Sequence, residues 1–137
     1  MEFIVDTCVI IDYLKKKPVS SEVFKRLIKN HTVYFSSISV FELFVGIKEE
    51  EKRKTIKENL LGLVKILPFD SECAQIAAVI ERELREKGQV IGPKDTMIAA
   101  KSLAKKVPIV TSNIRHFKRI ENLDLYGTKE LLEKLEK

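Results

Sequence analysis

A chain of 137 residues has room for one domain with one hydrophobic core. Apolar residues form 45% and charged residues 33% of the composition, which excludes a disordered chain, and no apolar run approaches the roughly 20 residues that span a bilayer. The net charge of +5 favours a polyanionic partner, although Lys- and Glu-rich surfaces also occur for stability alone. Because the N-terminus also lacks the pattern of a signal peptide, we expect a single cytoplasmic domain over residues 1–137, without a membrane segment.

The first half of the chain alternates patterns typical of strands and helices. The expected elements, in chain order, are a buried strand over 2–5 that ends at Asp6, a helix over 9–17 stopped by Pro18, a helix capped by Ser20 or Ser21 that ends at 30–31, a strand over 32–35, and a helix over 38–48. The charged run 49–54 is expected to be solvated surface.

The second half repeats this alternation. The expected elements are a strand over 64–67, a helix from Asp70 or Ser71 to Lys87 with Gly88 as its stop, a helix over 94–105, a strand that runs from 109–110 into 111–113, a last short strand, and a helix that begins near Thr128. Strands joined by helices indicate an α/β fold with a mostly parallel sheet. Ligands of such sheets bind beyond the carboxyl ends of the strands, which places Asp6 and the loop 111–113 at the candidate site.

Three acidic residues stand at positions where a carboxylate needs a partner. Asp6 ends an apolar strand, so its charge is partly removed from water. Glu42 lies within the stretch 38–46, which is apolar on nearly all sides, and Asp95 opens the helix that follows Gly92-Pro93. Each also has an ordinary explanation. Asp6 and Asp95 can stabilise the N-terminus of a helix, and Glu42 can lie on a narrow exposed strip of an otherwise buried helix. The three acids indicate a site only as a group.

Such a group of acids predicts metal chemistry. Three carboxylates within about 5 Å of one another would repel by a few kcal/mol per pair, and a bound divalent cation would remove that repulsion. Oxygen ligands without a neighbouring His or Cys favour Mg²⁺ or Mn²⁺ over zinc. Such an ion, bound with water, polarises a phosphodiester and helps to generate hydroxide. We therefore expect phosphodiester hydrolysis, with Asp6, Glu42 and Asp95 as the catalytic and metal-binding residues.

Four segments, in order, resemble the motifs of the PIN-domain family: IVDTCVIID over 4–12, SVFEL over 39–43, GPKDTMIAA over 92–100 and VTSNIRHF over 110–117. The resemblance spans essentially the whole chain and is closest to the toxin subunits of VapBC toxin–antitoxin pairs. It implies a three-layer α/β/α fold around about five mostly parallel strands. It also implies a Mg²⁺- or Mn²⁺-dependent endoribonuclease toxin that acts on an RNA such as tRNA or rRNA, forms a homodimer and is silenced by a cognate antitoxin protein.

The resemblance also assigns the site residues. It places the three characteristic acids at Asp6, Glu42 and Asp95. It places the supporting polar residues at Thr7, Thr111 and Ser112. Asn113 stands where many relatives carry an aspartate, so it can coordinate a metal ion only weakly and adds no charge. This departure predicts one tightly bound ion, with a second that arrives with the phosphates of the substrate.

The remaining polar residues receive ordinary interpretations. His116, in a loop before Phe117, and His31 are expected to contact backbone or solvent, and Cys8 and Cys73 are expected to be buried reduced thiols. The basic residues that flank the site in sequence either guide the phosphate backbone or are solvated helix faces: Lys94, Lys101, Lys105, Lys106, Arg115, Lys118 and Arg119.

Other functions stay open to different degrees. A non-catalytic RNA- or antitoxin-binding module with the same fold is left open by Asn113 and by the weak link between fold and function. A phosphatase of the haloacid-dehalogenase type is disfavoured, because it needs a second aspartate two residues after the first, where this chain has Cys8. A DNA nuclease remains chemically feasible.

Overall fold

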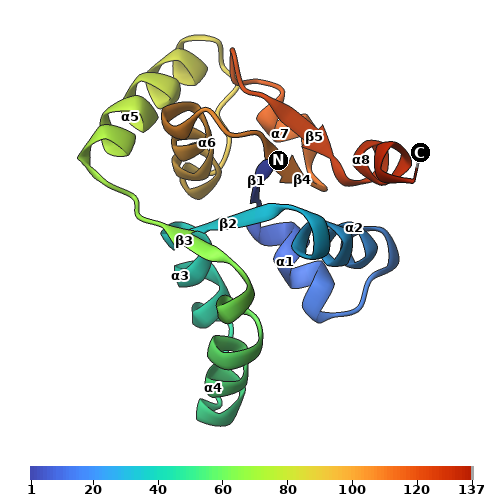
Figure 1. Cartoon of the computed structure of the whole chain (residues 1–137). Helices are drawn as coiled ribbons and strands as arrows, with labels where there is room; N and C mark the ends of the chain where they lie inside the picture. The colour runs from blue at the N-terminus through green and yellow to red at the C-terminus, as the bar shows by residue number, and fades with distance from the viewer. Residues whose placement is uncertain (137) are drawn as a thin grey trace.

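A five-stranded sheet lies between two layers of helices in the computed structural model, which describes residues 1–136 (Figure 1). The strands are β1 (Glu2–Val5), β2 (Thr32–Ser36), β3 (Lys65–Leu67), β4 (Ile109–Thr111) and β5 (Leu125–Gly127). They pair in the order β3-β2-β1-β4-β5, and all four pairings are parallel. The expected three-layer α/β/α fold with about five mostly parallel strands is therefore confirmed.

Helices connect successive strands, as parallel pairing requires. They are α1 (Thr7–Leu14), α2 (Pro18–Asn30), α3 (Ser37–Val45), α4 (Glu50–Asn59), the 3₁₀ turn η1 (Leu61–Leu63), α5 (Ser71–Glu86), α6 (Pro93–Lys105), α7 (Ile114–Phe117) and α8 (Thr128–Leu135). Among residues 1–136, no helix combines the length and the apolar character needed to cross a membrane.

The two faces of the sheet bury separate apolar cores, because successive strand residues point in opposite directions. On β1, Phe3 and Val5 pack into the core covered by α1, α2 and α8, whereas Ile4 packs into the core covered by α5 and α6. Figure 1 shows these two groups of helices on opposite sides of the sheet. Burial on both faces explains why β1, β2 and β4 are nearly continuous apolar runs in the sequence.

The order of the strands creates a crevice beside β1. The chain leaves β1 for β2 and β3 on one side and then crosses over the other face to reach β4 and β5. The connections therefore diverge between the carboxyl ends of β1 and β4, the position at which doubly wound sheets bind ligands. Asp6 follows β1 and Thr111 ends β4, so both lie at this point.

The predicted start of α2 is wrong. Ser20 and Ser21 do not cap the helix but lie buried inside it, and Lys17 occupies the cap position without a side-chain hydrogen bond. The expected stop of the preceding helix at Pro18 is also wrong, because α1 ends at Leu14. Pro18 instead begins α2, since its fixed φ and missing N–H suit a first helical position. The expected cap of α5 at Asp70 is confirmed, with Asp70 Oδ1 accepting from the N–H of Cys73 at 3.0 Å.

The charged segment and the loop before Phe117 are both helical. Most of the run 49–54 lies in α4, which has no buried residue and projects away from the sheet (Figure 1), so its predicted exposure is confirmed. Residues 114–117 form α7 rather than a loop. Such a four-residue helix is too short to show a periodic apolar pattern in the sequence.

Candidate active site

Asp6 lies at the centre of the site, between the end of β1 and the start of α1. Its side chain is 3% exposed and caps α1, with Oδ1 accepting from the N–H of Thr7 at 2.8 Å. Oδ2 accepts from the hydroxyl of Thr111 at 2.8 Å and from the thiol of Cys8 at 2.9 Å. Donors from the neighbouring strand and from the first turn of α1 therefore fix the orientation of this carboxylate.

Burial governs the protonation of Asp6. The pKa of this carboxyl is raised from 3.8 to about 6, mainly because burial removes it from water, with a smaller contribution from the negative charge of Asp95. The hydrogen bonds from Cys8, Thr111 and Thr7 partly offset this rise. The pKa of Asp95 is also raised, mainly by desolvation, while His116 lowers it. Both acids thus lie in a setting where a bound cation would be favourable.

Glu42 joins Asp6 through Thr7. The hydroxyl of Thr7 lies 2.8 Å from Glu42 Oε1 and 2.8 Å from the hydroxyl of Ser39, while the N–H of the same threonine binds Asp6. These contacts connect the first turn of α1 with α3, whose N-terminal end follows β2. The supporting position predicted for Thr7 therefore corresponds to a direct contact with one of the three acids.

The environment of Glu42 differs from the expectation in one respect. The stretch 38–46 is apolar on nearly all sides, but α3 is not buried all round, since Phe41 is 55% and Val45 68% exposed. Glu42 itself is half-buried, on the side of α3 that faces Thr7. Apolar composition alone could not distinguish a buried helix from one with an exposed apolar face.

Asp95 occupies the first turn of α6, as expected, and contacts a histidine that the sequence did not assign to the site. His116 Nδ1 lies 3.6 Å from Asp95 Oδ2 and 3.0 Å from Nδ2 of Asn113. The expectation that His116 contacts only backbone or solvent is therefore wrong. The position of α7 beside the start of α6 creates this contact, and no local pattern near His116 encodes it.

Cys8 is a second residue that sequence reasoning missed. Besides the bond to Asp6, its sulfur accepts from the hydroxyl of Ser112 at 3.0 Å and lies 3.4 Å from that of Thr111. Both cysteines are reduced, as expected, but Cys8 is only partly buried. Desolvation and the charge of Asp6 raise the pKa of the thiol to about 11, so it remains protonated at neutral pH. The position of Cys8, two residues after Asp6 in the first turn of α1, was the feature of the sequence that could have indicated its contact with Asp6.

Several of the predicted phosphate-guiding residues have other partners. Lys101 pairs with Asp70 at 3.5 Å, and Arg119 donates to the carbonyl of Val90 at 3.2 Å. Lys105 and Lys106 lie at the far end of α6, roughly 15 Å from Asp95 by helix rise. Lys94 directly precedes Asp95, and its Nζ lies 5.6 Å from the ring centroid of Phe41. Lys94 is therefore next to Asp95 in the sequence and close to α3, which carries Glu42.

Within residues 1–136, no three acidic, histidine or cysteine side chains are already close enough together to form a metal site. The acids are instead connected in pairs, Asp6 and Glu42 through Thr7, and Asp6 and Asp95 through the charge that raises the pKa of Asp6. The carboxylate oxygens are donors that suit Mg²⁺ or Mn²⁺. The donor chemistry thus fits a hard divalent cation.

Comparison with known proteins shows to which family the chain belongs. The sequence matches the PIN domain family over residues 3–123. The chain belongs to the PIN domain family. Among curated PIN-domain relatives, Ribonuclease VapC2 of Rickettsia felis is 33% identical over 91% of this chain and 96% of its own length. The tRNA(fMet)-specific endonuclease VapC of Shigella flexneri is 31% identical over 90% of this chain and 95% of its own length.

Solved PIN-domain structures share the fold over nearly the whole chain. The crystal structure of VapBC2 from Rickettsia felis bound to a promoter DNA fragment contains a chain with a TM-score of 0.81 and 30% identity, covering 93% of this chain and 98% of that one. The DNA-bound VapBC of Salmonella typhimurium has a TM-score of 0.78 and 28% identity, with coverage of 93% and 98%. The expected resemblance to VapC-type members of the PIN-domain family is therefore confirmed.

Proposed function

We propose that this PIN-domain protein is a Mg²⁺- or Mn²⁺-dependent endoribonuclease, with Asp6, Glu42 and Asp95 as the catalytic acids that hold the metal ion. The observation that carries the proposal is the buried Asp6 carboxylate at the carboxyl edge of the sheet, with its pKa raised to about 6. Such a carboxylate is costly to keep ionised without a cation. Asp95 contributes a second charge, and Glu42 a third carboxylate that shares Thr7 with Asp6.

The surrounding residues orient these acids. The hydroxyls of Thr111 and Thr7 hold Asp6 and Glu42, and the imidazole of His116 lies 3.6 Å from Asp95. When bound, the cation would neutralise the carboxylates and polarise the scissile phosphodiester. Asn113 binds His116 and supplies no charge, which supports one tight ion rather than two.

The biological setting follows from the relatives. Their names describe ribonucleases, one of them specific for tRNA(fMet), and the similar structures are VapBC complexes. We therefore infer an RNA substrate, such as tRNA or rRNA, and a role as the toxin of a toxin–antitoxin pair with a cognate antitoxin protein. A homodimer is part of the same proposal. The net charge of +5 supports a polyanionic substrate.

Cleavage of a fluorescent single-stranded RNA with Mn²⁺, Mg²⁺ or EDTA tests the proposal. We expect metal-dependent cleavage that Asp6→Asn and Asp95→Asn each reduce by roughly a hundredfold or more, because each removes a charge that acts on the metal. Asp124→Asn, at an exposed position outside the site, is the matched control and is expected to retain activity.

Two outcomes would contradict this proposal, the first its site residues and the second its enzymatic function. Cleavage that persists in both folded site variants would exclude Asp6 and Asp95 from catalysis. RNA binding in EDTA without cleavage under any divalent ion would instead support a non-catalytic RNA-binding module of the same fold.

A further inference from the structure

A pocket of about 540 Å³ opens beside the candidate active site, at the carboxyl ends of β4 and β5. Its floor is shared with the site, because Thr111 and Ser112 line the pocket and also contact Asp6 and Cys8. The far wall begins at Thr128, directly after β5, which is two strand spacings or about 10 Å from β1. A substrate group attached to a phosphate at Asp6 can therefore reach this pocket.

Part of the pocket wall is apolar. Pro18 and Val19, at the start of α2, and Ile114, at the start of α7, are the apolar side chains of its lining. The charges around it balance, since Asp12 and Glu130 offset Lys17 and Lys129. The lining therefore carries no excess positive charge to attract a second phosphate, and the pocket suits a flat, uncharged group with polar edges.

Thr128 and Asp12 are two polar side chains of the lining that could form hydrogen bonds with such an uncharged group. Thr128 is only 7% exposed, and its hydroxyl has no hydrogen-bond partner among residues 1–136. No fully enclosed polar side-chain atom in these residues lacks a partner, so the hydroxyl is accessible, and Thr128 lines the pocket.

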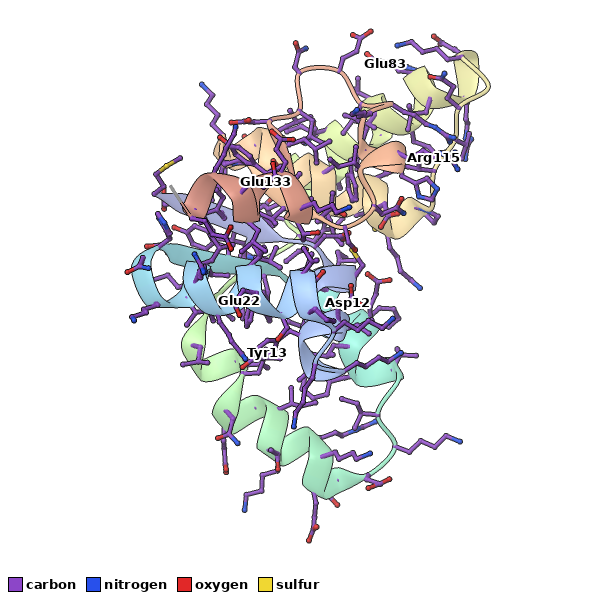
Figure 2. The ribbon with its side chains drawn as sticks, turned by 90° about the vertical axis from the view of Figure 1, so that its right-hand side faces the viewer. Asp12, Tyr13, Glu22, Glu83, Arg115 and Glu133 are labelled. Carbon is purple, nitrogen blue, oxygen red and sulfur yellow. The ribbon has the colours of Figure 1, made fainter. Side chains whose placement is uncertain are left out.

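Asp12 provides the acceptor. It lies on α1 on the face of the molecule seen in Figure 2, where its carboxylate accepts from Ser20 at 3.1 Å and lies 3.8 Å from Lys17. A carboxylate has about four lone-pair directions, so these contacts leave acceptor capacity toward the pocket. Of the RNA bases, guanine offers two adjacent N–H groups on one edge and matches an ionised carboxylate best.

We propose that this pocket binds the nucleobase adjoining the scissile phosphate, with guanine preferred. Pro18, Val19 and Ile114 contact the faces of the base, and Asp12 and Thr128 bind its edge. The inference rests on the proposed ribonuclease function and adds to it a determinant of the cleavage sequence. The hydrogen bonds to the edge of the base distinguish guanine from the other bases, and the apolar contacts select for a flat group.

The test uses a random-sequence single-stranded RNA with Mn²⁺, and the fragment ends are sequenced. In the wild-type protein we expect guanine to be enriched at one position next to the cut. Val19→Phe fills the pocket from the α2 side and should remove the enrichment and lower kcat/KM on guanine-containing sites by roughly tenfold or more. Val79→Phe makes the same change on the exposed face of α5, far from the pocket lining, and should keep the wild-type distribution.

A binding measurement separates this inference from the proposed function. GMP is titrated into the wild-type protein without metal, and the methyl NMR signals of Ile114 and Thr128 are followed, with UMP as the comparison. Larger shifts with GMP that Val19→Phe abolishes would support the subsite even if no RNA is cleaved. Cleavage without guanine enrichment, enrichment that Val19→Phe leaves intact, or GMP shifts no larger than those with UMP would overturn it.

Discussion

The hydroxyl of Thr111 donates a 2.8 Å hydrogen bond to Oδ2 of Asp6, across two adjacent parallel strands and 105 positions of sequence. This bond stabilises the ionised form of a carboxylate whose burial favours the neutral form. The balance between the two effects leaves Asp6 ionised at neutral pH at a cost to folding. The site is therefore expected to be less stable without a metal ion than an uncharged equivalent would be.

The first prediction concerns that cost. Well below pH 3.8, Asp6 is neutral in the folded and unfolded states, whereas above about pH 6 it is ionised in both, so folding must bury the charge. The wild-type protein thus loses roughly 3 kcal/mol of stability from this group as the pH rises from 3.8, the unfolded pKa, to about 6, the folded pKa. Asp6→Asn cannot ionise, so in EDTA it should become more stable than wild type by about that amount between pH 4 and pH 8.

Urea unfolding at pH 4 and pH 8 measures this difference. Asp124→Asn, an exposed acid-to-amide change, should follow the wild-type pH dependence and so serves as the control. Equal pH dependence of wild type and Asp6→Asn would show that Asp6 is not held in a desolvated state. Addition of Mn²⁺ should stabilise the wild type and not the Asp6→Asn protein.

The second prediction addresses the link between Thr7 and Glu42. Thr7→Val keeps the shape of the side chain but removes the hydroxyl that contacts Glu42 and Ser39 at 2.8 Å. Loss of such an orienting contact typically lowers activity about 10- to 100-fold, and we expect that loss in RNA cleavage. Thr7→Ser should restore most of it, because the hydroxyl returns.

Thr55→Val is the matched control for this change. Thr55 lies on the exposed helix α4, where its hydroxyl donates to the carbonyl of Glu51 at 3.0 Å. Cleavage by this variant should equal that of the wild type. If Thr7→Val cleaved RNA at the wild-type rate, Glu42 would not depend on Thr7 for its position.

The third prediction concerns the reactivity of Cys8. Burial and the charge of Asp6 raise the pKa of its thiol from 9.0 to about 11, so at pH 8 the reactive thiolate is roughly a hundredfold scarcer than in the unfolded chain. Iodoacetamide should label Cys8 at least that much more slowly in the native protein than in urea, as measured by peptide mapping. Asp6→Asn should speed native labelling, because the charge is gone. Native labelling as fast as in urea would contradict the contact with Asp6.

The residues at strand ends could be predicted from sequence because apolar runs mark buried parallel strands. The runs before Asp6 and Thr111 identify two strands, and the alternation of strands and helices places their carboxyl ends on one edge. Gly92-Pro93 likewise marks the start of α6 and so the place of Asp95. In each of these cases the information lies within a few residues of the site residue.

The contacts of Cys8 and His116 could not be predicted in this way. The thiol of Cys8 meets Ser112, 104 positions away, only because β1 and β4 are neighbours in this order of strands. His116 meets Asp95 because α7 packs next to the start of α6. The local periodicity of the sequence does not indicate either contact. Both contacts depend on how the strands and helices pack against one another in the folded protein.

The fourth prediction tests the role of Asn113. Its amide lies 3.0 Å from His116 Nδ1, which is itself 3.6 Å from Asp95 Oδ2, so Asn113→Asp would add a fourth carboxylate close to Asp95. Without metal, this added repulsion should lower the stability of the protein. With Mn²⁺, it should create a second tight site, because a carboxylate is a stronger ligand than an amide for a hard cation.

Isothermal titration calorimetry should therefore find one tight Mn²⁺ in the wild-type protein and two in Asn113→Asp. Asn122→Asp, in the exposed loop before β5, adds the same charge away from the acids and should keep the stoichiometry at one. Two tight ions in the wild type would mean that three carboxylates suffice for both, and the explanation based on the missing aspartate would be wrong. One ion in Asn113→Asp would show that position 113 lies outside the reach of the metal.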